Sequence, residues 1–214
     1  MEEGPIDWLG TSMGGLIGMW AAADFSLPVS SEEEQRQEVE KQRIKPIHIR
    51  KLVINDIGPY FSKDVIIRLG DYLKHAEAPT FQNFKDAFTY FRRIYEPFKA
   101  SEEEIQTLVS RSIYKCKEGS GFVVHYDPAI GTPLRCAPEQ LKDVDMWSVW
   151  EQMKVSHSIL VIRGGESDVL SSSTFERMKA RDGVAAIEFE GIGHAPTLMR
   201  QNQIEPVISF LLQP

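Results

Sequence analysis

The stretch Gly10-Thr11-Ser12-Met13-Gly14-Gly15 places a serine inside a G-x-S-x-G pattern. In this pattern a strand runs through a sharp turn into a helix, and the small residues two before and two after the serine let backbone segments pack closely around a strained turn. The flanking sequence is of the right kind, because residues 6–9 can form a short buried strand and residues 16–23 an apolar helix. The alternative is an ordinary glycine-rich turn into a helix. The serine therefore needs partners elsewhere in the chain before it counts as a nucleophile.

Two further segments place polar side chains just after sequences of strand type. Gly191-Ile192-Gly193-His194-Ala195-Pro196 follows the apolar stretch 184–189, and the stretch 164–168, which ends in Asp168, follows the buried-strand pattern 158–163. Each candidate thus lies at the carboxyl end of a strand, where open α/β sheets gather their ligands and their chemistry.

These residue types suit nucleophilic catalysis, and they occur in the chain order serine, acid, histidine. A serine hydroxyl becomes an effective nucleophile when a neutral imidazole takes its proton, and a carboxylate on the other ring nitrogen fixes the tautomer and stabilises the imidazolium. With the motifs GTSMGG, LVINDIGP, LVIRGGESDVLS and GIGHAP, the sequence resembles the α/β-hydrolase superfamily, specifically its lidded esterase-like branch. The resemblance spans most of the chain. It implies Ser12 as nucleophile, Asp168 as acid and His194 as base, with the backbone N–H of Met13 as one oxyanion-hole donor.

Two other acidic residues could take the role that is assigned to Asp168. Asp56 lies just after the strand pattern 52–55, a position that some hydrolases of this superfamily use, and Glu166 lies two residues before Asp168. Asp168 is favoured because it follows the next-to-last strand, as the motif requires. If these residues have no catalytic role, Asp56 is a turn residue and His194 is a hydrogen-bonded loop histidine. The remaining histidines lack such a setting and are interpreted as structural or surface residues: His48, His75, His125 and His157.

The patterns divide the chain into three sections. Residues 1–59 hold the elbow strand, the elbow helix, a charged insertion at 30–43 and the next core strand; residues 60–145 form a helical lid without β periodicity; residues 146–214 form the C-terminal core with the acid and histidine loops. The charged insertion is expected to be a solvated helix or loop, with an acidic interaction face as the alternative.

Aromatic residues mark the expected packing of the lid and of the core helices. In the lid, aromatic residues recur at steps of three and four and line one helix face: Phe81, Phe84, Phe88, Phe91 and Tyr95. This stripe predicts a lid core, with the lining of an apolar acyl-binding or ring-binding cleft as the alternative. Trp147 and Trp150 are expected to dock a helix onto the core, and an apolar C-terminal helix to cover the last strand.

The expected fold is α/β: a partial α/β-hydrolase fold of about four parallel strands flanked by helices, with an inserted helical lid and with the N-terminal strands absent. In the family four strands precede the elbow, and the loop after the third supplies the second oxyanion donor. The elbow strand is therefore expected to be an open apolar edge, at which self-association or a complementing chain would pair.

Composition narrows the classes of partner. The 214 residues include 24 Lys and Arg against 31 Asp and Glu, a net charge of −7, which argues against nucleic acid or an anionic membrane surface as the main partner. No secretory signal or membrane-spanning stretch is evident, so a cytoplasmic protein is expected. Cys116 and Cys136 are interpreted as free thiols. No motif calls for a cofactor or a metal.

The predicted function is that of a serine hydrolase acting on a small carboxylic ester or similar acyl substrate through a Ser-His-Asp triad and an acyl-enzyme, impaired if the preceding strands are missing. The aromatic lid favours an apolar or aromatic acyl group. The motifs do not separate esters from thioesters, amides, lactones or carbon–carbon bonds. The alternative is a catalytically inactive α/β-hydrolase-like fragment that acts as a binding module.

Overall fold

A computed structural model describes residues 4–23, 47–73, 79–116, 119–134, 138–153 and 158–213. The predictions for the charged insertion 30–43, for His75 and His157, and for Cys136 concern residues outside these ranges. Cys116 is partly exposed and is not in a disulfide.

A four-stranded parallel sheet forms the centre of the core, as the sequence predicts. Its strands are β1 (Ile6–Thr11), β2 (Ile49–Asn55), β8 (Ile159–Gly164) and β9 (Val184–Phe189), in the order β1-β2-β8-β9. In the register Thr11 pairs with Asn55, and Asn55 with Ile162. The strands β1 and β2 therefore end level with each other, and the residues that follow them become neighbours.

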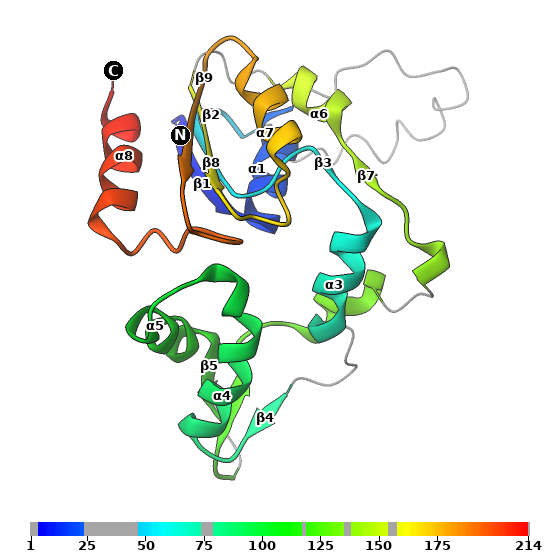
Figure 1. Cartoon of the computed structure of the whole chain (residues 1–214), viewed down its shortest axis with the longest axis vertical. Coiled ribbons are helices and arrows are strands. Elements are labelled where there is room, and N and C mark those ends of the chain that lie inside the picture. The colour runs from blue at the N-terminus through cyan, green and yellow to red at the C-terminus, as the bar shows by residue number, and fades with distance from the viewer. Residues whose placement is uncertain are drawn as a thin grey trace.

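Helices cover both faces of this sheet (Figure 1). One face carries α1 (Met13–Ala22), α6 (Trp147–Gln152) and α7 (Ser172–Lys179), and the other carries α8 (Gln201–Leu212). Parallel strands are normally covered in this way, which is why β2 and β8 are almost wholly buried.

The predictions for the helices of the core are confirmed. Trp150 is buried in the cluster that contains Met19 of α1, and Trp147 packs against the same cluster. On the opposite face Val207 of α8 packs with apolar side chains of β2 and β8, and Phe189 of β9 joins them.

At the sheet edge, β1 has a strand neighbour on one side only within the described residues. Its Ile6 and Leu9 side chains are exposed, as are Met13 and Ile17 of α1. Within the same ranges, no helix combines the length and the hydropathy that crossing a bilayer requires.

Residues 60–145, here called the inserted segment, come after β2 and before β8 in the chain. In space the inserted segment lies beyond one end of the sheet (Figure 1). Its helices are α3 (Lys63–Leu73), α4 (Phe84–Ile94) and α5 (Glu102–Ser112), with 3-10 turns η2 (Glu96–Phe98), η3 (Pro128–Leu134) and η4 (Pro138–Gln140).

The inserted segment is not helical throughout, so the expectation of a purely helical lid is wrong in part. Strands β3 (Tyr60–Phe61) and β7 (Val144–Asp145) form one antiparallel pair, and β4 (Thr80–Phe81), β6 (Phe122–Val124) and β5 (Ile113–Lys115) form a three-stranded sheet. These strands are two or three residues long, too short to produce a visible period-2 pattern.

The aromatic stripe packs within the inserted segment. Phe91 is buried beside Ala87, and the other members of the stripe pack partly buried against the same cluster. The Phe91 and Tyr95 rings stack at 5.5 Å between centroids. The interpretation of the stripe as core of the inserted segment is confirmed, although Phe81 lies in β4 and not on the helix face.

Candidate active site

Ser12 occupies the sharp turn between β1 and α1. Its backbone has φ 50° and ψ −119°, a left-handed φ that is costly for a residue with a Cβ and that is found mainly where the surrounding structure enforces it. Two backbone hydrogen bonds hold this conformation: the Ser12 N–H donates to the Asn55 carbonyl at 2.9 Å, and the Ser12 carbonyl accepts from the Gly15 N–H at 2.8 Å. The turn holds the serine side chain at the carboxyl end of the sheet.

The two glycines around this turn are not equivalent. A Cβ on Gly10 would lie 2.2 Å from the backbone carbon and oxygen of Gly14, so strand and helix approach too closely for any side chain there. A Cβ on Gly14 would meet no described atom within 4 Å. Close packing therefore requires the glycine before the serine, whereas the expectation for the one after it is wrong.

His194 lies between Ser12 and Asp56. Its Nε2 is 3.2 Å from the Ser12 Oγ, and its Nδ1 is 2.8 Å from Oδ2 of Asp56. An ionised carboxylate can only accept, so Nδ1 carries the proton, and Nε2 of the neutral ring is left to accept from the serine hydroxyl. The imidazole thus lies between a serine hydroxyl and a carboxylate, within hydrogen-bond distance of both.

Asp56 is fully buried and fixed from two sides. It follows the last residue of β2, its φ is 58°, and its N–H donates to the Ile162 carbonyl at 2.8 Å. Its Oδ1 accepts from the Gly164 N–H at 2.9 Å, which leaves Oδ2 for His194. A buried carboxylate needs such partners, because an unpaired charge would be strongly unfavourable there.

The structure contradicts the favoured placement of Asp168 on the histidine. The Asp168 side chain is 46% exposed and forms an ion pair with Arg68 of α3. The other rival, Glu166, pairs with Lys99 of the inserted segment. The residue after β2 lies beside the serine turn because β2 adjoins β1, while both acidic side chains after β8 are held in ion pairs with the inserted segment.

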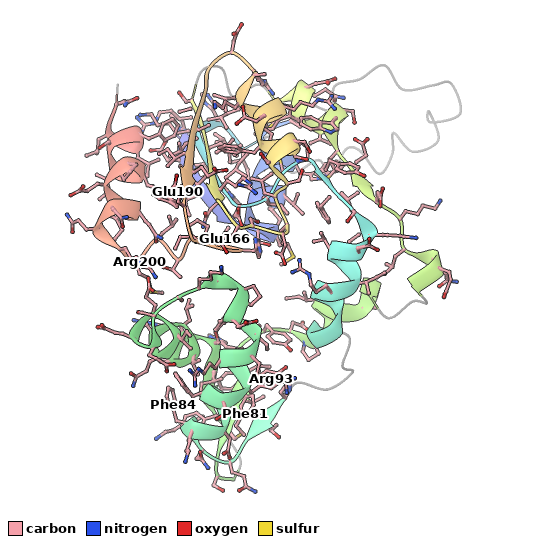
Figure 2. All side chains as sticks on the ribbon, in the orientation of Figure 1. Phe81, Phe84, Arg93, Glu166, Glu190 and Arg200 are labelled. Carbon is pink, nitrogen blue, oxygen red and sulfur yellow. The ribbon has the colours of Figure 1, made fainter. Side chains whose placement is uncertain are left out.

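A charged cluster joins the histidine loop to the inserted segment. The Glu104 carboxylate accepts from Thr197 Oγ1 at 2.8 Å, from Arg200 Nη2 at 2.8 Å and from the Ser101 N–H at 2.7 Å. Figure 2 shows Arg200 and Glu166 on the core side of this junction. Burial raises the pKa of Glu104, but the hydrogen bonds from Arg200, Ser101 and Thr197 outweigh it and lower the pKa to about 2.

The turn η2 lies directly against the histidine loop. The Phe98 ring lies 5.8 Å from the His194 ring between centroids, and Phe98 also contacts Tyr95 edge to face at 5.2 Å. A Cβ on Gly193 would lie 1.6 Å from the Pro97 carbonyl oxygen, so the two backbones pass in close contact. The inserted segment thus forms one wall around His194.

Comparison with known proteins indicates the family of the chain. No family model matches the chain. A 3-hydroxybutyrate-oligomer hydrolase of Cupriavidus necator is 32% identical over 206 residues, 93% of this chain and 62% of that protein. A crystal structure of a protein from Rickettsia typhi, assigned as a hydrolase, is 31% identical with a TM-score of 0.74, over 98% of this chain and 63% of that one. The chain belongs to the α/β-hydrolase superfamily.

A second solved structure, an α/β-hydrolase from Novosphingobium aromaticivorans, is 25% identical with a TM-score of 0.70, over 95% of this chain and 64% of that one. The chain therefore spans somewhat less than two thirds of the length of these relatives, and its sheet is a partial α/β-hydrolase fold.

In α/β-hydrolases the residue after the serine supplies an oxyanion-hole donor. Met13 is here the first residue of α1, where backbone N–H groups have no partner within the helix. Its assignment as a donor stays a prediction. Within the described parts of the chain, no group of three or more His, Cys, Asp or Glu side chains is arranged to hold a metal ion.

Sequence reasoning missed two buried polar residues of this chain. Asn55 ends β2 with no exposed surface, and Arg163 near the end of β8 is 6% exposed. A signal for both exists: each is a polar residue that follows three or four consecutive apolar residues at the end of a strand pattern, shortly before a candidate acid.

Proposed function

We propose that this chain carries the catalytic triad of a serine hydrolase, with Ser12 as nucleophile, His194 as general base and Asp56 as the acid that orients the base. The observation that supports the proposal best is the position of the His194 ring, which has one nitrogen 3.2 Å from the serine oxygen and the other 2.8 Å from the carboxylate. The homology to hydrolases supports the same reaction class.

In the proposed reaction the Ser12 Oγ attacks the carbonyl carbon of an ester while its proton passes to Nε2 of His194. The resulting imidazolium is stabilised by Asp56 and then gives the proton to the departing alkoxide, which leaves an acyl-enzyme and an alcohol. Water, deprotonated by His194, releases the acid and restores Ser12. The Met13 N–H is the proposed donor to the oxyanion.

For the substrate we propose a carboxylic ester, with short esters of hydroxy acids as the first class to examine. The support is the relative from Cupriavidus necator, whose name specifies an oligomer of 3-hydroxybutyrate. Serine hydrolases of this kind need no metal or cofactor for the steps above.

The test is active-site labelling followed by turnover. A fluorophosphonate probe is expected to label the wild-type chain at Ser12, and neither Ser12→Ala nor His194→Gln should be labelled at a comparable rate. Hydrolysis of 3-hydroxybutyrate dimer and trimer is then compared with that of a nitrophenyl butyrate. The same assays on a version extended upstream in its reading frame measure what further chain contributes.

A folded, soluble sample that resists the probe in both versions would overturn the proposal and favour the binding-module alternative. If Ser12 is labelled but the hydroxybutyrate esters are not hydrolysed, the proposed triad is supported and the proposed substrate class is rejected.

A further inference from the structure

Asn55 touches each of the three segments that carry the proposed triad. Its backbone carbonyl accepts from the Ser12 N–H at 2.9 Å, and its side-chain Nδ2 donates to Thr11 Oγ1 at 3.0 Å and to the Pro196 carbonyl at 2.9 Å. Thr11 immediately precedes the serine, Pro196 lies two residues after His194, and Asn55 itself immediately precedes Asp56.

The chemistry of these partners fixes which way the amide faces. A carbonyl oxygen such as that of Pro196 can only accept, so the NH₂ group must face it, and the reversed amide would place two acceptors against each other. The second N–H of the same group then reaches Thr11. One amide nitrogen thus joins the elbow strand to the histidine loop.

The other end of the amide has a cost in stability. The side chain is fully buried, yet its Oδ1 has no hydrogen-bond partner among the described residues. A buried acceptor without a partner lowers the stability of the fold, so an apolar residue at the end of this apolar strand would avoid that penalty. What an apolar residue cannot supply is the pair of donors.

We infer that Asn55 is a positioning residue, whose amide holds the histidine loop at the distance from the elbow at which His194 Nε2 meets Ser12 Oγ. It touches no reacting atom and acts through Thr11 and Pro196. This inference rests on the proposed function, because it assigns a role toward the same triad.

The experiment compares variants of the full chain with a soluble ester as substrate. Asn55→Ala removes both donors and is expected to lower kcat by about 10- to 100-fold with KM nearly unchanged, since a misplacement of about 1 Å is enough for such a loss. Thr11→Val removes one acceptor and should lower kcat less, while Thr11→Ser keeps the hydroxyl and should behave as wild type. The double variant Asn55→Ala with Thr11→Val should be no slower than Asn55→Ala alone.

A second readout does not depend on turnover. The proton shared by His194 Nδ1 and Asp56 should give a far-downfield NMR resonance in the wild type, identified by its loss in His194→Gln. In Asn55→Ala this resonance should shift or broaden, with the far-ultraviolet circular dichroism of the folded protein unchanged.

The two proposals fail in different ways. If the wild type is active, and if Asn55→Ala folds and keeps both the wild-type kcat and the wild-type resonance, the positioning role is overturned. The proposed triad is then unaffected. Additive losses in the double variant also count against it. A wild type that neither labels nor turns over overturns the proposed function, and the NMR comparison still decides whether Asn55 holds His194 against Asp56.

Discussion

Asp56 lies 2.8 Å from His194 although 138 positions of sequence separate the two residues. The contact forms because β2 and the loop after β9 meet at the same end of a parallel sheet, and because the Gly164 N–H turns the carboxylate by holding its other oxygen. The two acidic residues that follow β8 are both engaged in ion pairs with the inserted segment.

The first prediction separates the two candidate acids. Asp56→Asn should lower kcat for ester hydrolysis on the order of 10³- to 10⁴-fold, since the amide favours the wrong tautomer of His194 and cannot stabilise the imidazolium. Asp168→Asn loses only an exposed ion pair and should stay within about threefold of wild type. Steady-state kinetics on one ester decide between them, and equal losses in the two variants would contradict the assignment.

The second prediction concerns the glycines that flank the serine. Gly10→Ala should destabilise the fold by about 3 kcal/mol, because its Cβ would meet the backbone of Gly14 and a rotamer change cannot relieve the contact. Gly14→Ala, in open space within a helix, should change the free energy of unfolding by no more than about 1 kcal/mol. Urea unfolding monitored by circular dichroism measures both, and a tolerated Gly10→Ala would refute the close approach.

The third prediction is a pH dependence of stability. The folded pKa of Glu104 is about 2, below its ordinary value of 4.5, so the carboxylate favours the folded state above pH 4.5, and this contribution is lost as the pH falls from 4.5 toward 2. The difference corresponds to at most about 3 kcal/mol, and less where solvent screens the partly exposed Arg200.

Glu104→Gln should therefore lower the free energy of unfolding at pH 7 and flatten its decline between pH 4.5 and 2. The matched control is Glu103→Gln, which removes the same charge from an exposed position on the same helix. Parallel stability curves for wild type and Glu104→Gln over this pH range would contradict the role of the carboxylate.

The fourth prediction concerns the loop after β8. The buried guanidinium of Arg163 donates to the carbonyls of Leu170 and Gly165 and pairs with Glu188. Arg163→Lys keeps the charge but lacks the planar fork, so we expect a loss of about 2–4 kcal/mol in unfolding free energy. Arg92→Lys, at an exposed ion pair with Glu102, should change it by less than about 1 kcal/mol. Thermal unfolding of both variants makes the comparison, and similar melting temperatures would refute the prediction.

Much of the fold followed from local patterns. The strands that precede Ser12 and His194 are recognisable because each apolar stretch ends in a glycine-containing turn, and the four-stranded parallel sheet was predicted from them. The short strands of the inserted segment were not, because pairing between segments such as β4 and β6 depends on contacts distant in sequence.

The choice of acid shows what a single sequence lacks. Asp56 and Asp168 both follow strand patterns, and only the three-dimensional contacts decide which of them faces His194. One local difference favours Asp56: it comes one residue after its strand, whereas Asp168 lies four residues after Gly164, and a site held at a strand end is more rigid than one within a loop. The ion pair with Arg68 that engages Asp168 could not be seen before the fold was known.

The contact of Phe98 with His194 limits how the inserted segment of this chain can be exchanged. The rings of Phe91, Tyr95 and Phe98 form a continuous series that ends on the His194 ring, so the core of the inserted segment and the proposed base are parts of a single packing unit. A chimaera that takes residues 60–145 from a relative would carry over a new neighbour for the histidine along with any new substrate preference. Such a graft should keep Pro97 and Phe98 from the host, and its borders should fall on either side of that turn.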